Sequence, residues 1–351
     1  MNGRTISRSQ LASLVSDLVG AGVGVVAPVR APDGHLDYRP VARLEEAVLD
    51  GGLPRLSLKS LFLPPTEPLF SFRKSGSDVA IDSVPTAFPP RVVLGAVPCD
   101  AAGVEALDKV MGWDYRDELW FGRREATTVV SVACSQGDAS CFCGATGNGP
   151  AGTRGADLLL LSLDDGFAVE VVTPKGEALV STHPGRFGEA PNEADVAKRR
   201  AALLEGRVEP AGPLAPVTAW LGGHFDDPVW EGVALRCHGC GACASVCPTC
   251  HCFDIVDEPE GVTRGTRRRN WDTCQTARFT LHASGHNPRS VQDARYRQRV
   301  LHKFSIYPER FGELLCTGCG RCSRACPGGM DLPEVLRALA ARATAPAGGV
   351  A

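Results

Sequence analysis

The sequence of 351 residues is 44% hydrophobic and carries a formal net charge of −3. This length predicts two or three domains, and the composition excludes a disordered tail protein and a collagen-like fibre. The small net charge gives no general case for binding nucleic acid or acidic membranes. No run of about 18 apolar residues predicts a membrane span, and the polar residues 1–10 lack the apolar core of a signal peptide. We therefore expect a cytoplasmic protein.

Helix and strand patterns alternate in the first half of the chain. Leu11, Leu14, Val15 and Leu18 have the spacing of an amphipathic helix over residues 7–18. This mixture predicts an α/β fold for the N-terminal part. The further expected elements are a strand at 23–26, a hairpin turn at 33–34, an extended connector at 61–72, a strand at 92–97, a helix at 101–111, and strands at 129–133, 158–163 and 167–172.

The composition changes toward the C-terminus, where strand patterns become rare and cysteines become frequent. These changes predict four parts. They are an N-terminal helix and hairpin region at 1–60, an α/β domain with cysteines at 61–183, a linker at 184–214 and a cysteine-rich, mainly helical domain at 215–345.

Fifteen cysteines fall into three groups with long stretches between them. In a chain of this size without an export signal, metal ligation explains them better than disulfides do. The first group is Cys99, Cys134, Cys141 and Cys143; the second is Cys237, Cys240, Cys243, Cys247, Cys250, Cys252 and Cys274; the third is Cys316, Cys319, Cys322 and Cys326.

Two runs have the pattern C-x2-C-x2-C-x3-C-P, one over residues 237–248 and one over residues 316–327. This pattern is typical of two-cluster ferredoxins, in which three close thiolates hold one [4Fe–4S] cluster and the fourth cysteine reaches the other cluster. Two structural zinc sites are the alternative, but zinc needs only four ligands and does not explain the repeated third cysteine. The predicted ligands are Cys237, Cys240, Cys243 and Cys326 for cluster one, and Cys316, Cys319, Cys322 and Cys247 for cluster two.

The two runs are separated by a long insert, residues 253–315, which is basic. Residues 264–303 contain ten arginines and lysines against two aspartates. This segment is either a solvated charged face or a docking surface for a partner subunit. Nucleic acid is a weaker interpretation, because no recognisable module interleaves aromatic residues with the charges.

The remaining cysteines form two groups outside the ferredoxin-type runs. Cys99 and Cys134 each follow a predicted strand, and Cys141-Phe-Cys143 lies in a loop rich in glycine and serine. These four predict a possible third cluster, with buried reduced thiols as the alternative. Cys250, Cys252 and Cys274 are one ligand short of a further metal site unless His251 or Asp272 completes it.

Five stretches together resemble a known family. They are residues 93–100, which end in Pro-Cys99-Asp100, residues 132–143, Val-Cys-Pro-Thr-Cys-His-Cys-Phe-Asp at 246–254, Trp-Asp-Thr-Cys at 271–274 and His-Lys-Phe at 302–304. In combination they resemble the iron–sulfur beta subunit of cytoplasmic sulfhydrogenases, which are NAD(P)-linked [NiFe] hydrogenases. They are also similar to the A subunit of anaerobic sulfite reductase.

The resemblance implies an electron-relay subunit. It implies partners on two sides: a flavin- and NAD(P)-binding subunit, and either hydrogenase small and large subunits or a sulfite reductase catalytic subunit. The sequence has no G-x-G-x-x-G dinucleotide motif between a strand and a helix and no P-loop, which agrees with a relay that lacks its own nucleotide site. A self-contained iron–sulfur enzyme and a non-redox, metal-stabilised module are the alternatives.

Overall fold

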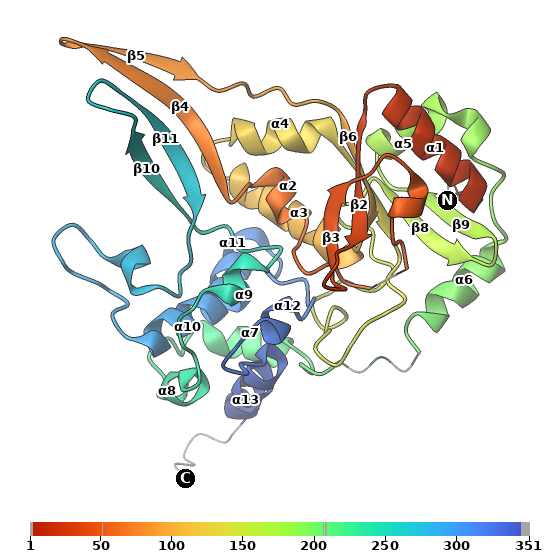
Figure 1. Ribbon diagram of the computed structural model, residues 1–351. Helices are drawn as coiled ribbons and strands as arrows, with labels where there is room; N and C mark the ends of the chain where they lie inside the picture. Colours follow the sequence, from red (N-terminus) through yellow and green to blue (C-terminus); the bar gives the residue numbers. More distant parts are fainter. Residues whose placement is uncertain (1–2, 51, 206, 208, 345–351) are drawn as a thin grey trace.

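The computed structural model describes residues 3–50, 52–205, 207 and 209–344. Its N-terminal part contains a seven-stranded sheet in which four central strands run parallel and antiparallel strands lie at both edges (Figure 1). In sheet order the strands are β1 (Gly3–Ile6), β9 (Gly166–Val171), β8 (Leu158–Leu163), β7 (Thr127–Val132), β6 (Arg91–Ala96), β2 (Gly24–Arg30) and β3 (Leu36–Pro40).

Both faces of this sheet are covered by apolar packing. Successive strand residues point to opposite faces, so Val92 and Leu94 pack in one core while Val93 packs in the other. The prediction of an α/β N-terminal part is confirmed. The first core includes α1 (Arg8–Gly20) and α5 (Pro174–Thr182), and the second includes α2 (Lys59–Phe62), α3 (Pro98–Met111) and α4 (Glu118–Ala126).

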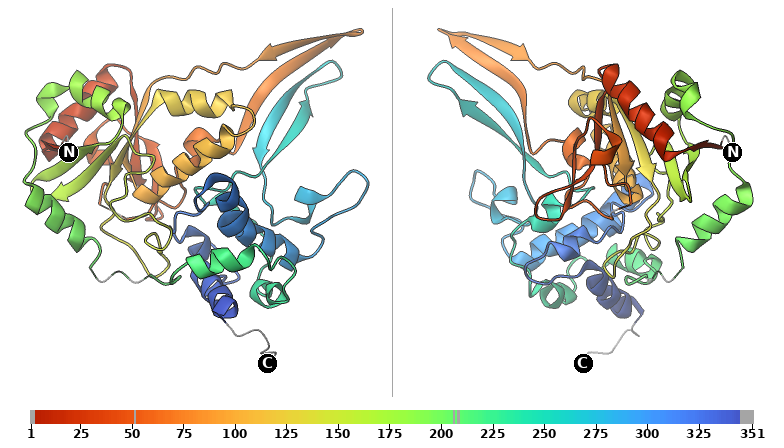
Figure 2. Two further views of the ribbon diagram at one scale, coloured as in Figure 1. Left: turned by 180° about the vertical axis from the view of Figure 1, so that it is seen from behind. Right: turned by 45° about the vertical axis from the view of Figure 1, so that its right-hand side comes forward.

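A second, four-stranded antiparallel sheet projects from the molecule (Figure 1 and Figure 2). It joins two hairpins that are far apart in sequence, because β11 pairs with β4. The predicted extended connector at 61–72 is therefore wrong in part: most of it forms β4, which carries a register irregularity between its partners Arg267 and Arg268. In sheet order the strands are β10 (Phe253–Pro259), β11 (Arg264–Trp271), β4 (Thr66–Ser75) and β5 (Asp78–Ser83).

The arginines of β11 are paired with carboxylates rather than free. Arg267 bonds Asp257 at 2.7 Å and Arg268 bonds Glu258 at 2.7 Å, both across the β10–β11 hairpin. Arg269 is buried and pairs with Glu67 of β4 and with Asp117. The docking-surface alternative is therefore wrong for Arg269, which is buried. The pairing of Arg267 and Arg268 with acids of β10 favours the alternative of a solvated charged face for these two residues.

Arg269→Met should destabilise the fold by about 1.5–3 kcal/mol, the usual range for a hydrogen bond to a charged group. The loss is limited because Glu67 keeps a second partner, Arg123, at 2.6 Å. Denaturant unfolding under anaerobic conditions measures it. Arg267→Met is the matched control: its ion pair is exposed and should contribute less than about 1 kcal/mol. Equal effects of the two variants would contradict a structural role for Arg269.

The C-terminal part combines helices with the β10–β11 hairpin, so it is not helical throughout. A nearly continuous helical segment runs through α10 (Gln292–Leu301), a π-helical turn η4 (His302–Ile306) and α11 (Tyr307–Phe311). No helix in the described residues has the length and apolar character needed to cross a membrane. The other helices of the chain are α6 (Glu193–Ala202), α7 (Ala215–Leu221), α8 (Val229–Ala234), α9 (Ala242–Ser245), α12 (Arg321–Arg324) and α13 (Leu332–Thr344), with 3-10 turns η1 (Leu44–Glu46), η2 (Pro184–Arg186) and η3 (Ala277–Thr280).

Candidate iron–sulfur site

The two cysteine runs adopt the same local backbone. Gly239 and Gly241 in the first run have φ of +69° and +78°, and Gly318 and Gly320 in the second have φ of +65° and +68°. Each pair leads into a short helix, α9 or α12. Residues with a side chain rarely adopt this left-handed backbone conformation, so glycine is favoured at these four positions. The repeated sequence pattern is thus a repeated local structure.

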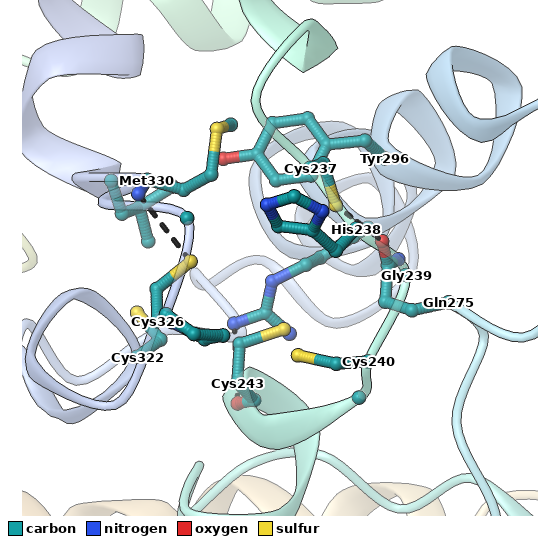
Figure 3. Close-up of a pocket in the computed structure, with 15 residues that line it drawn as sticks. Cys237, His238, Gly239, Cys240, Cys243, Gln275, Tyr296, Cys322, Cys326 and Met330 are labelled. Atoms are coloured by element: carbon teal, nitrogen blue, oxygen red, sulfur yellow. Dashed lines mark hydrogen bonds between the residues drawn. The ribbon is translucent and has the colours of Figure 1, made fainter.

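Cysteines from both runs line one hollow (Figure 3). Cys237, Cys240 and Cys243 line it together with Cys326, and Cys322 borders it as well. The backbone N–H of Met330 donates to the sulfur of Cys326 at 3.4 Å. The structure therefore brings the fourth cysteine of the second run to the first three cysteines, which is the arrangement predicted for cluster one.

Cys247, the fourth cysteine of the first run, is buried. Its sulfur lies 3.3 Å from the hydroxyl of Thr249, which donates to the carbonyl of Leu315 at the start of the second run. Burial, with the neighbouring thiolates of Cys322 and Cys247, raises the pKa of Cys316 to about 12. Burial, with Cys247, Cys319 and Cys243 nearby, also raises the pKa of Cys322 to about 11. Cys247 thus lies within electrostatic reach of Cys316 and Cys322. Metal ions displace thiol protons, so these buried thiols are groups that a bound cluster would hold as thiolates.

Arg299 and Lys303, expected in a basic docking surface, are instead buried among the cysteines. Arg299 donates to the sulfur of Cys250 and to the carbonyl of Cys243, both at 3.4 Å. The ammonium of Lys303, on the π-helical turn, donates to the sulfur of Cys247 at 3.4 Å. Burial alone would lower the pKa of Lys303, but the thiolates of Cys247 and Cys250 outweigh it and raise the pKa. Buried cations need an anionic partner, and here that partner is sulfur.

Lys303→Met should lower the reduction potential of the cluster bound through Cys247, because a nearby cation favours the more negative reduced state. The expected shift is on the order of tens of millivolts. A redox titration followed by EPR measures it. Lys175→Met is the matched control, since Lys175 bonds only the backbone carbonyls of Arg124 and Thr127 and lies near Asp157. An unchanged potential in Lys303→Met would contradict the placement of Lys303 beside a cluster.

The four N-terminal cysteines gather at the ends of the parallel strands. Cys99 lies in the first turn of α3, just beyond β6, and Cys134 follows the adjacent strand β7. Burial raises the pKa of the Cys99 thiol, with Cys319 and Cys134 among the nearby charges. Burial also raises the pKa of Cys143 to about 11, and Cys141 and Cys134 are again neighbours. The structure therefore brings the four residues into one region, and it adds Cys319 of the second run to that region.

The loop of Cys141 and Cys143 packs directly on the second run. The N–H of Phe142 donates to the carbonyl of Gly318 at 2.8 Å. A Cβ added to Gly318 would lie 2.4 Å from the carbonyl oxygen of Phe142, and one added to Gly320 would lie 2.5 Å from that of Ser140. The glycines of the second run thus admit a loop of the N-terminal part as well as turning the chain. This contact had no signal in the sequence.

A buried ion pair joins the same two segments. Asp100, next to Cys99, accepts two hydrogen bonds from Arg321 at 2.6 and 2.8 Å and one from the hydroxyl of Tyr38 at 2.8 Å. Arg321 lies between Cys319 and Cys322 and also donates to the carbonyl of Pro54. The N-terminal part is therefore clamped to the second cysteine run at the point where their cysteines meet.

The spacing of the thiols fits a cluster better than a single metal ion. Among residues 3–344 as described, no three His, Cys, Asp or Glu side chains converge closely enough to hold one ion. Zinc needs four ligands around one point, with Zn–S near about 2.3 Å. A [4Fe–4S] cluster binds each sulfur through a different iron, so its ligands stand further apart. Cys237, Cys240, Cys243 and Cys326, which line one hollow, suit that arrangement.

Comparison with known proteins identifies the family. Residues 236–330 match the family described as "4Fe-4S dicluster domain". Over 318 residues the chain is 31% identical to "Sulfhydrogenase 2 subunit beta" of Pyrococcus furiosus. The alignment covers 89% of this chain and 91% of that protein. Both matches agree with the duplicated cysteine runs and the resemblance found in the sequence. The chain is therefore an iron–sulfur electron-transfer protein that belongs to the family of sulfhydrogenase beta subunits.

Proposed function

We propose that this chain relays electrons within a multisubunit oxidoreductase, between a flavin- and NAD(P)-binding subunit and a hydrogenase catalytic module. The observation that carries this proposal is the hollow shared by the two cysteine runs, with Cys326 beside Cys237, Cys240 and Cys243. Two clusters in one small domain form a short path for electrons. The similar protein from Pyrococcus furiosus is a sulfhydrogenase subunit, which favours a hydrogenase module over the sulfite reductase alternative.

The proposed ligands are the eight cysteines of the two runs. When bound, the clusters supply one-electron transfer, and the protein sets their potentials through burial, nearby charge and hydrogen bonds to sulfur. Gln292 donates to the sulfur of Cys237 at 3.2 Å, and Lys303 donates to that of Cys247. These donors stabilise negative charge on the ligands. The full set is Cys237, Cys240, Cys243 and Cys326 for cluster one, and Cys316, Cys319, Cys322 and Cys247 for cluster two.

A third cluster bound by the N-terminal cysteines would extend the path beyond cluster two. Its proposed ligands are Cys99, Cys134, Cys141 and Cys143. Support comes from the contact of Phe142 with Gly318 and from the proximity of Cys319 to Cys99. The guanidinium of Arg207 lies 3.9 Å from the sulfur of Cys134 and supplies positive charge there.

Redox cycling of the complex that co-purifies with this chain tests the relay. We expect NAD(P)H to bleach the visible absorption of its clusters when the flavin subunit is present, and dithionite to do so in the isolated chain. Reoxidation of the reduced clusters with evolution of H2 would then identify the hydrogenase module. Clusters that dithionite reduces but that exchange electrons neither with NAD(P)H nor with NAD(P)+ in the complex would contradict the proposed link to a flavin subunit, and a chain without redox-active metal would contradict the relay itself.

A further inference from the structure

Three cysteines outside the two ferredoxin-type runs meet at the base of the β10–β11 hairpin. Cys252 immediately precedes β10, and Cys274 is the third residue after β11. Because the two ends of an antiparallel hairpin lie side by side, and Phe253 pairs with Trp271 at the end of this one, the topology brings Cys252 and Cys274 to the same place. The N–H of Asp272 also donates to the carbonyl of Cys252 at 3.0 Å, which fixes the two segments to each other.

Cys250 completes the group and connects it to the two runs. It lines the same cavity as Cys252, and its sulfur accepts a hydrogen bond from Arg299 at 3.4 Å. Gln275 donates to the sulfur of Cys274 at 3.4 Å, as Gln292 does to Cys237. The three thiols are therefore ordered by the surrounding protein and lie next to the proposed clusters.

The charge around these cysteines is positive and buried. Lys59 is only 3% exposed, donates to the carbonyl of Ala244 at 3.1 Å and lies 3.8 Å from the ring centre of Trp271. Cys250 and Cys252 line the same cavity as Lys59. In the part of the chain that the structure describes, no carboxylate pairs with it.

Lys59 is the cation that the two ferredoxin-type clusters do not explain. Lys303 already faces Cys247, whereas Cys250 and Cys252, which line a cavity with Lys59, belong to neither of the two ferredoxin-type clusters. Burying an ammonium group is costly without a compensating anion. A cavity of about 150 Å³ lies at this place and is lined by residues that include Lys59, Cys240, Cys250, Cys252, Trp271 and Asp272.

We propose that Cys250, Cys252 and Cys274 bind a further iron–sulfur cluster whose fourth corner faces the cavity beside Lys59 and Asp272. Three thiolates hold three corners of such a cluster, and its negative charge is balanced by Lys59 and Arg299. Since Cys240 also lines this cavity, the cluster would lie beside cluster one and add a branch to the electron path. The proposal rests on the iron–sulfur chemistry of the proposed function, but not on the identity of any partner subunit.

The double variant Cys252→Ala/Cys274→Ala of the full chain tests the site. After anaerobic purification, we expect a loss of about three or four irons per chain relative to the wild type, with the EPR signals of the other clusters retained. Unchanged iron content, or a loss of zinc in place of iron, would overturn the proposal. A wild-type chain without iron would instead overturn the proposed relay, so the two failures are distinguishable.

Lys59→Met provides a test that leaves every cysteine in place. We expect it to shift the potential of the cluster lost in the double variant, or to reduce the amount of that cluster, with the remaining signals unchanged. Lys175→Met is the control for removing a half-buried lysine of the N-terminal part. If Lys59→Met and Lys175→Met leave the EPR spectra and potentials equally unaffected, Lys59 does not face a cluster and the proposed site is wrong.

Discussion

Asp100→Ala should destabilise the protein by about 3–5 kcal/mol, the usual cost of removing one partner of a buried ion pair. Asp100 and Arg321 are 0% and 3% exposed. Removing the carboxylate leaves the guanidinium buried with only the carbonyl of Pro54 as a partner in the described residues. Because Asp100 adjoins Cys99 and Arg321 lies within the second cysteine run, we also expect cluster two to become more sensitive to oxygen.

Chemical denaturation under anaerobic conditions measures the free energy of unfolding. Asp138→Ala is the matched control: Asp138 bonds Arg324 of the same run at 2.6 Å, but this pair is exposed and should contribute less than about 1 kcal/mol. The double variant Asp100→Ala/Arg321→Met should recover part of the loss, since it removes the unpaired charge. If Asp100→Ala costs no more than Asp138→Ala, the buried clamp does not hold the two parts together.

Cys247→Ser and Cys326→Ser should each alter the cluster formed by the other run. Cys326 lines the hollow of Cys237, Cys240 and Cys243, and Cys247 lies near Cys316 and Cys322. Serine offers an oxygen ligand, so we expect a shifted or three-iron EPR signal rather than complete loss of the cluster.

Run-specific variants identify which signal belongs to which cluster. Cys240→Ser should alter the signal of cluster one and Cys319→Ser that of cluster two. The spectrum of Cys247→Ser should then resemble that of Cys319→Ser, and the spectrum of Cys326→Ser should resemble that of Cys240→Ser. The opposite correspondence would mean that each run binds its own fourth cysteine.

The sequence predicted the local elements of the N-terminal sheet well because their signals are local. The spacing of Leu11, Leu14, Val15 and Leu18 predicts a helix, and these four residues are buried in α1. The strands at 92–97 and 129–133 are continuous apolar runs that become the neighbouring parallel strands β6 and β7. Their ends place Cys99 and Cys134 at one edge of the sheet, as expected.

Contacts between distant segments were not predictable in the same way. Residues 61–72 were expected to be an extended connector because Pro64, Pro65 and Pro68 interrupt this apolar segment. Most of it forms β4, whose partner β11 lies about two hundred residues away in sequence. The charges of the insert were misread for the same reason. Tertiary packing pairs Arg269 with Glu67 and brings Arg299 and Lys303 into hydrogen bonds with cysteine sulfurs.

The cysteine runs could be interpreted from sequence because their spacing is itself the chemistry: three thiolates within seven residues fit the corners of one cluster. The clamp of Asp100 and Arg321 has no such pattern, although both residues adjoin predicted ligands. A charged residue next to a metal-binding cysteine is the signal by which such a partner can be sought in a sequence.

Iron and acid-labile sulfide per chain, measured after anaerobic purification of the full-length protein, test the central claim most directly. Two ferredoxin-type clusters predict about eight irons and eight sulfides, and occupation of the N-terminal cysteines raises this to about twelve. A cluster at Cys250, Cys252 and Cys274 adds about three or four irons more. Zinc in place of iron, or fewer than about eight irons with no labile sulfide, would contradict the assignment of these cysteines to iron–sulfur clusters.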